Sequence, residues 1–282
     1  MTLTAQLPTR AFLVVSACLL GSACGNDSAR APNPTSYRWP DEFAYRFDYV
    51  SDAQQRGQTV QHYAETRTTR FRIRDAQYFG VSDSVLKTSQ RPGEPLRVIA
   101  YEPEDTLGFY VSIGRRGEIT QVQLACDPAL PACAGALPSG VALQLRRIIP
   151  RLPIWEAPRG SSWEDTLEFD DTSRPGGTRG AMLTRYRGRG DTLIAGRRYW
   201  VISWSSVRTA TRPGEGAKGP IREDGMSLVE KDRLLPVFAV WAAVVVAPPE
   251  LRARGATGIG YRGRVYLAGS VFDSLYSREI DH

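Results

Sequence analysis

Residues 43–50 have the sequence Phe43-Ala44-Tyr45-Arg46-Phe47-Asp48-Tyr49-Val50. Aromatic side chains occupy every second position, and the charged side chains of Arg46 and Asp48 lie between them. Alternate side chains of an extended strand point to opposite faces, so this period of two indicates a strand with one buried face. We therefore expect the four aromatic side chains to line the interior of a sheet: Phe43, Tyr45, Phe47 and Tyr49.

Alternating segments of this kind continue along the chain, separated by turns rich in glycine. A second row, Trp200, Ile202 and Trp204, shares one face of the segment Arg197–Ser205. About a dozen strands suffice for a large curved antiparallel sheet or half-open barrel, so the predicted fold class is mostly β. The other predicted strands are Thr59–Arg74, Leu96–Tyr101, Phe109–Ile113, Ile119–Leu124, Trp163–Phe169, Met182–Arg187, Ser227–Lys231, Val237–Val246, Gly260–Ala268 and Val271–Tyr276.

One short amphipathic helix interrupts the predicted strands. Apolar residues recur at helical spacing from Val141 to Ile149, Ser139 is placed to cap the N-terminus, and Pro150 ends the helix. The helix is either a plug or lid beside the sheet or an element that closes one end of the core. We expect three of its polar side chains to face outward: Gln144, Arg146 and Arg147.

The segment 234–246 is apolar on both faces. It is too short to span a bilayer as a helix, which takes about 20 apolar residues. A strand packed between the sheet interior and another layer explains this pattern, and a wall for a hydrophobic ligand is the alternative.

The N-terminus has the features of a secretory signal peptide. Arg10 precedes an apolar run over residues 11–20, and small residues at 21–23 follow it. Small residues directly before Cys24 resemble the lipobox of bacterial lipoproteins, in which cleavage occurs before a lipid-modified cysteine. We predict a signal peptide over residues 1–23 and a lipid anchor at Cys24; a cleaved signal followed by a spare cysteine is the alternative.

The lipobox resemblance implies a diacylglycerol on the Cys24 sulfur and a further acyl chain, such as palmitate, on its amine, which together anchor stably. Gly25 in place of aspartate implies the outer membrane of a diderm bacterium. Residues 24–41 are polar and contain proline, which predicts a flexible tether. Residues 42–282 are then a single β-rich domain held near the membrane surface.

Two other cysteines, Cys126 and Cys133, flank a proline-containing loop. In an oxidising compartment they pair most simply with each other, so we predict a structural disulfide. A metal site needs further ligands nearby and none is evident in the sequence, so we predict neither a metal nor a cofactor.

The composition argues against common catalytic chemistry. His62 and His282 are the only histidines, which excludes a multi-histidine metal site and disfavours catalysis by Ser–His or Cys–His pairs. Only three of the 36 cationic residues are lysine, and the net charge is +6. A GC-rich genome explains the arginine bias, and recognition of anions is the functional alternative. For an exported protein the favoured partner is an anionic lipid headgroup or a sugar rather than nucleic acid. We expect the protein not to be an enzyme.

Four short stretches resemble a group of uncharacterised bacterial envelope lipoproteins. That group is similar in outline to the Lol-type lipoprotein carriers, which are curved antiparallel half-barrels with a helical plug and an apolar cavity. The resemblance implies a role in hydrophobic-ligand binding or envelope assembly, and it transfers no functional residues. The stretches are Arg151–Ile154, Gly160–Trp163, Gly196–Val201 and Gly255–Gly258.

Two functional hypotheses follow. In the first, a membrane-anchored, non-catalytic lipoprotein binds a lipid or a lipoprotein acyl chain inside the half-barrel, against the two rows that begin at Phe43 and Trp200. In the second, a structural or protein-interaction lipoprotein of the envelope has the same sheet with a filled core. The size of an internal cavity distinguishes them.

Overall fold

The fold was obtained as a computed structural model. It describes residues 36–56, 58–99, 106–125, 136–154, 159–173, 177–211, 220–246, 252–253 and 255–276. The predicted signal peptide, Cys24 with most of the tether, and both members of the predicted disulfide, Cys126 and Cys133, lie outside these residues. No helix within them is long and apolar enough to cross a membrane.

Nearly all described elements are strands of one antiparallel sheet. The elements are β1 (Glu42–Gln55), β2 (Gln58–Arg74), β3 (Gln77–Gln90), β4 (Arg97–Ile99), β5 (Leu107–Ile113), β6 (Ile119–Leu124), α3 (Pro138–Ile148), β7 (Ser162–Asp170), β8 (Arg179–Ile194), β9 (Arg197–Thr211), β10 (Ile221–Glu230), β11 (Leu235–Val246), β12 (Ala256–Leu267) and α5 (Val271–Tyr276).

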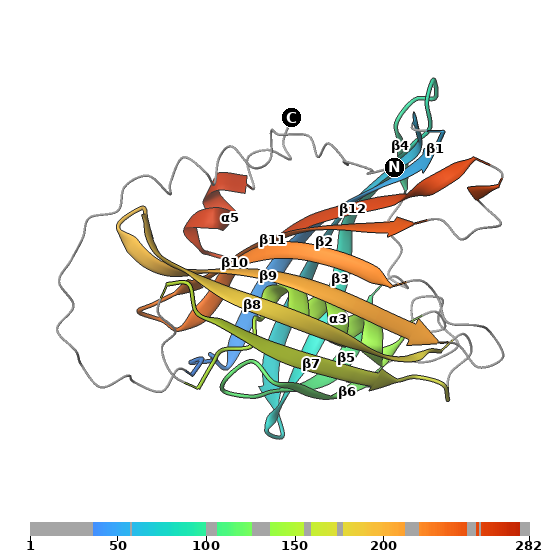
Figure 1. The fold of residues 1–282 in the computed structure, drawn as a ribbon. Helices are drawn as coiled ribbons and strands as arrows, with labels where there is room; N and C mark the ends of the chain where they lie inside the picture. Colours follow the sequence, from blue (N-terminus) through green and yellow to red (C-terminus); the bar gives the residue numbers. More distant parts are fainter. Residues whose placement is uncertain are drawn as a thin grey trace.

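The strands are ordered β6-β5-β3-β2-β1-β12-β11-β10-β9-β8-β7, with β4 beside β3. Most neighbours are hairpin partners, and the long-range pairing of β1 with β12 joins the two halves. The sheet curls into a nearly closed barrel around α3 (Figure 1). The predicted fold class, a mostly β curved antiparallel sheet, is therefore confirmed.

Glycines on the concave face let the sheet coil tightly. The indole of Trp204 lies across Gly225, where an added Cβ would come within 2.3 Å of the ring, and Trp241 covers Gly263 in the same way. Strand glycines of this kind mark places where a large side chain approaches the backbone. Both pairs face the interior, so the curvature and the aromatic lining form together.

Segments around α3 bridge the two edge strands, β6 and β7. Arg146 forms an ion pair with Asp165 of β7 at 2.9 Å and donates a hydrogen bond to the carbonyl of Gly117, just before β6. After the helix, Arg151 forms an ion pair with Glu118. The amide of Leu152 donates to the carbonyl of Arg116 on the same side. These contacts link the sheet edges through the helix.

The prediction of α3 is correct, but two details of it are wrong. The N-terminal cap comes from Asp171, whose carboxylate accepts a hydrogen bond from the Ser139 amide at 3.2 Å, and no side chain of the helix itself caps it. Arg146 and Arg147 do not face solvent, because the sheet surrounds the helix and supplies a carboxylate to each. The third side chain expected to face outward, Gln144, lines an interior cavity.

The convex face carries a second apolar layer. α5 lies over it, and Phe272 stacks on Phe238 of β11 at 4.7 Å between ring centroids and meets Tyr199 of β9 edge-on. Val237 and Ala239 of β11 point to the other face and are fully buried. A strand packed between two layers thus accounts for the segment that is apolar on both faces.

Two strand predictions differ from the structure. Val271–Tyr276, predicted as a strand, is the helix α5, because Ser270 and Asp273 cap its N-terminus: the Asp273 amide donates to Ser270 Oγ, and Asp273 accepts from the Gly269 amide. β3 was not predicted. Its concave positions include the small residues Gly80 and Ser82. The Phe109 ring occupies the space above Gly80, where a larger side chain would not fit.

Candidate functional site

The pairing register places both predicted aromatic rows on the concave face. Directly paired residues of neighbouring strands point to the same side of a sheet. From β1 through β12, β11 and β10 to β9, one row of paired residues is Phe47, Val265, Ala239, Ser227 and Ile202. The next row is Tyr49, Gly263, Trp241, Gly225 and Trp204. Strands far apart in the sequence therefore share one wall.

Around α3 this wall is tightly packed. Phe47, Ile202 and Trp204 are at most 6 % exposed, and Tyr45 is fully buried with its hydroxyl donating to the carbonyl of Pro236 at 2.7 Å. The Trp204 indole N–H donates to Ser227 Oγ at 3.1 Å. We call this region, which also includes Leu145 and Ile148 of α3, the packed half of the concave face.

Two further candidates, Phe43 and Trp200, lie at its margin. Phe43 is half-buried and stacks on Phe71 at 4.7 Å between ring centroids. Trp200 is half-buried too, and the Lys231 ammonium lies over its ring at 5.5 Å.

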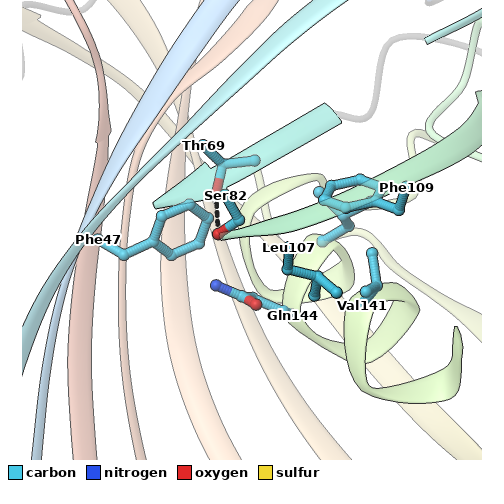
Figure 2. A pocket seen from close by; sticks show the side chains of 8 residues that line it. Phe47, Thr69, Ser82, Leu107, Phe109, Val141 and Gln144 are labelled. Carbon is cyan, nitrogen blue, oxygen red and sulfur yellow. Dashed lines mark hydrogen bonds between the residues drawn. The ribbon is translucent and has the colours of Figure 1, made fainter. Parts of the chain in front are cut away.

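A small cavity lies between α3 and the strands β1, β2, β3 and β5. Its volume is about 10 Å³, close to the space that one water molecule needs. Phe47, Phe109 and Val141 form apolar walls, while Gln144 and the hydrogen-bonded pair Thr69–Ser82 supply polar groups (Figure 2). This space has room for about one water molecule and is too small for an acyl chain.

Farther along β1 the same wall becomes polar. Tyr49 lies 5.8 Å from Tyr261 and 6.4 Å from Tyr63 between ring centroids, and all three side chains are only partly buried. The Tyr63 hydroxyl donates to Glu65, and Arg67 donates to the other oxygen of this carboxylate. Burial, followed by the neighbouring Tyr261 hydroxyl, raises the pKa of Tyr49 to about 12, so this hydroxyl stays protonated at neutral pH.

Arg147 and Glu223 form the boundary between the two regions. Nε and Nη2 of Arg147 donate to the two carboxylate oxygens of Glu223 at 2.8 and 2.6 Å, and the guanidinium lies 5.6 Å from the Trp241 ring centre. Burial alone would raise the pKa of Glu223, but the hydrogen bonds and charge of Arg147 outweigh it and the pKa is lowered. The carboxylate is therefore ionised and held in place.

Arg208 of β9 completes what we call the polar half: Tyr49, Tyr63, Tyr261, Arg147, Glu223 and Arg208. Of these six residues only Tyr49 was singled out from the sequence as a ligand-lining candidate. One signal was available for Glu223 and Arg208, since each shares the alternation of its strand with interior residues, Gly225 and Trp204 respectively. No cluster of three or more potential metal ligands of the His, Cys, Asp or Glu type occurs among the described residues.

Comparisons with known proteins identify no family. No family model matches the chain, and no curated protein sequence matches it. Among solved structures, one described as "Lipid-protein interactions in lipovitellin" is similar over 82 % of this chain, with a TM-score of 0.47 and 10 % sequence identity. This chain spans 25 % of that lipovitellin chain. A similarity at this level does not indicate what this chain binds.

Proposed function

We propose that the protein is a non-catalytic envelope lipoprotein, anchored through Cys24, that binds a hydrophobic ligand against the concave face of its sheet. One observation carries the proposal: Tyr49, Tyr63 and Tyr261 face the interior of the curved sheet yet remain partly exposed. Aromatic area on a concave wall is what small-molecule sites typically offer, together with a few fixed polar groups.

The predicted anchor supports the same function. A tether on the order of 20 Å long keeps the domain beside the membrane, where apolar and amphiphilic molecules are abundant. The polar half is the part of the wall not filled by α3. A ligand that reached Phe47 or Trp204 would have to displace the helix, because the described cavity beside it has room for about one water molecule.

The second hypothesis, a structural or interaction lipoprotein with a filled core, is favoured by a different observation. Four of the candidate lining residues are buried around α3: Tyr45, Phe47, Ile202 and Trp204. On this hypothesis the working surface lies outside the sheet and the interior binds nothing.

A neutral fluorescent probe such as N-phenyl-1-naphthylamine distinguishes the two. We expect its emission to rise with the wild-type protein and with Tyr110→Ala, which removes a half-buried aromatic ring from the convex face. Tyr261→Ala should bind the probe several-fold more weakly, since it removes ring area from the concave wall. If the wild-type protein leaves the emission unchanged, the filled-core hypothesis replaces the proposal.

The anchor has a separate test. Metabolic labelling with a fatty-acid analogue should label the wild-type protein, and Cys24→Ala should abolish labelling and leave an uncleaved precursor or a released domain. An unlabelled wild-type protein would show that the lipoprotein assignment is wrong.

A further inference from the structure

Arg208 is a guanidinium on the concave wall that pairs with none of the described residues. Ser206 lies two residues before Arg208 on β9 and pairs with Glu223 of β10. The side chain of Arg208 is therefore on the same face of the sheet as that of Glu223, two residues farther along β9. It is partly buried, and within the described part of the chain it makes no hydrogen bond or ion pair. The arginines Arg67, Arg146 and Arg147 on this side of the sheet each pair with a carboxylate. Arg208 differs from them, because no carboxylate among the described residues pairs with it.

The acid nearest to Arg208 is already occupied. Both oxygens of Glu223 accept hydrogen bonds from Arg147. Two guanidinium groups therefore face one carboxylate, which leaves an excess of one positive charge on the wall. Burial and the repulsion of Arg147 lower the pKa of Arg208, while Glu223 and Tyr261 act against this shift. An arginine nevertheless stays protonated in proteins, so the excess charge persists.

Further hydrogen-bond donors lie on the same wall. Tyr261 lies within electrostatic reach of both arginines, and the neighbouring Tyr49 hydroxyl is protonated. The indole N–H of Trp241, beside Arg147, is buried with no hydrogen-bond partner in the described residues. Buried donors without partners are rare, and one explanation for them is an acceptor that is bound in the functional state.

We propose that Arg208 and Arg147 bind the anionic oxygen headgroup of an amphiphile whose apolar part lies against Tyr49, Tyr63 and Tyr261. A planar guanidinium matches the geometry of phosphate and carboxylate oxygens and holds them through paired hydrogen bonds. Glu223 holds Arg147 in place and balances one positive charge, so the charge of Arg208 remains available to the headgroup. The inference rests on the proposed hydrophobic-ligand function and adds to it the chemical class of the ligand.

The experiment measures the binding of three compounds by titration calorimetry: decyl phosphate, decanol and inorganic phosphate. Arg208→Gln removes the charge, and Arg208→Lys keeps the charge without the planar fork. Arg222→Gln is the matched control, because Arg222 is the neighbour of Glu223 on β10, is exposed, and points to the convex face. Thermal melting checks that each variant is folded; Arg208 makes no hydrogen bond or ion pair with the described residues, so Arg208→Gln should melt close to the wild type.

We expect decyl phosphate to bind the wild type and Arg222→Gln about tenfold more tightly than decanol, and inorganic phosphate to bind weakly. In Arg208→Gln the two alkyl compounds should bind equally, and Arg208→Lys should fall between. The inference is overturned if Arg208→Gln keeps the preference for the phosphate, or if the wild type has no preference; in both cases the hydrophobic-ligand function survives.

Two further outcomes would contradict the hydrophobic-ligand function itself. If inorganic phosphate binds as tightly as decyl phosphate and the affinity is lost in Arg208→Gln, the site takes a free oxyanion and the hydrophobic-ligand function is wrong. If none of the three compounds binds the wild type, both the function and the headgroup site are wrong.

Discussion

The packed half and the polar half lie on the same face of the same strands, yet their side chains differ in kind. Around α3, concave positions carry Phe47, Ile202 and Trp204, and helix side chains complete the core. Beyond the helix, the corresponding positions carry Tyr49, Tyr261 and Arg208, which remain partly exposed. Figure 1 shows β1 and β12 extending past the region that α3 occupies.

The comparison indicates how one sheet combines a stable core with a partly exposed wall, which we propose binds the ligand. Where the helix fills the interior, apolar area is removed from water and stabilises the fold. Where it does not, the wall keeps hydrogen-bonding side chains that water or a ligand can satisfy. Arg147, in the last turn of α3, marks the change, because its pair with Glu223 fixes the helix at the border.

The largest difference should come from truncating one aromatic side chain in each half. Trp204→Ala should lower the free energy of unfolding by about 3–5 kcal/mol, since it removes a packed ring and leaves a void. Tyr261→Ala, in the polar half, should cost clearly less because its ring is already partly exposed. Denaturant unfolding of both variants measures the contrast. Equal losses would mean that the polar half is also packed core.

A smaller loss should follow from adding a methyl group under the Trp204 ring. Gly225→Ala would place a Cβ within 2.3 Å of the indole, so the ring or the strand has to shift, at a cost of about 1–3 kcal/mol. Gly260→Ala is the control, because the nearest atom to a Cβ there is 4.0 Å away. Thermal melting compares the two. A Gly225→Ala protein as stable as Gly260→Ala would argue against the close ring packing.

The ion pair between Arg147 and Glu223 should make the free energy of unfolding fall at low pH. The pKa of Glu223 is lowered in the folded state because the hydrogen bonds and charge of Arg147 outweigh the effect of burial. The stabilisation it gives is therefore present above the unfolded pKa, near 4.3, and is lost as the pH falls through the lower folded value. Glu223→Gln should flatten this part of the stability curve, measured by denaturant unfolding at a series of pH values. If the stability of Glu223→Gln falls at low pH as steeply as that of the wild type, Glu223 is not the group responsible.

The smallest effect is expected at alkaline pH in the polar half. The pKa of Tyr49 is raised to about 12, so its contribution to stability is complete below pH 10 and is lost as the pH rises through 12. Tyr49→Phe should remove one tyrosinate from the ultraviolet titration near pH 12. If the missing step instead lies near pH 10, Tyr49 is solvated like a free tyrosine.

Much of the fold could be predicted from the sequence because a strand with one buried face shows alternating apolar and polar residues. The segment around Tyr45 and the segment around Trp204 each show it, and the structure places both rows on one concave face. β3 was missed because its concave face carries the small residues Gly80 and Ser82; Gly80 is small because the Phe109 ring of β5 covers it, which is a tertiary requirement. The prediction of a strand over Val271–Tyr276 was wrong because it did not consider the helix cap formed by Ser270 and Asp273.

The polar half could be predicted only in part. Tyr49 belongs to an aromatic row, but Arg147 was expected to face solvent, since a charged residue near a helix end usually does. Its partner Glu223 lies on a strand 76 positions away, and no local pattern connects them. The spacing of Arg208 from Trp204 places it on the interior face of β9, but no local pattern shows that Tyr261 of β12 lies on the same wall. These residues come together through the pairing of β12, β11, β10 and β9 and through the ion pair between α3 and β10.

The most direct test of the central claim is to identify what the protein carries when isolated from its own membrane. The full-length protein would be extracted with detergent, washed, and examined by native mass spectrometry, with lipids released without breaking covalent bonds and identified separately. The account predicts about one non-covalently bound amphiphile per polypeptide, in addition to the acyl chains that we propose are attached at Cys24. A protein that carries no lipid beyond its covalent anchor, or only a variable mixture without fixed stoichiometry, would contradict the account and favour a filled-core structural lipoprotein.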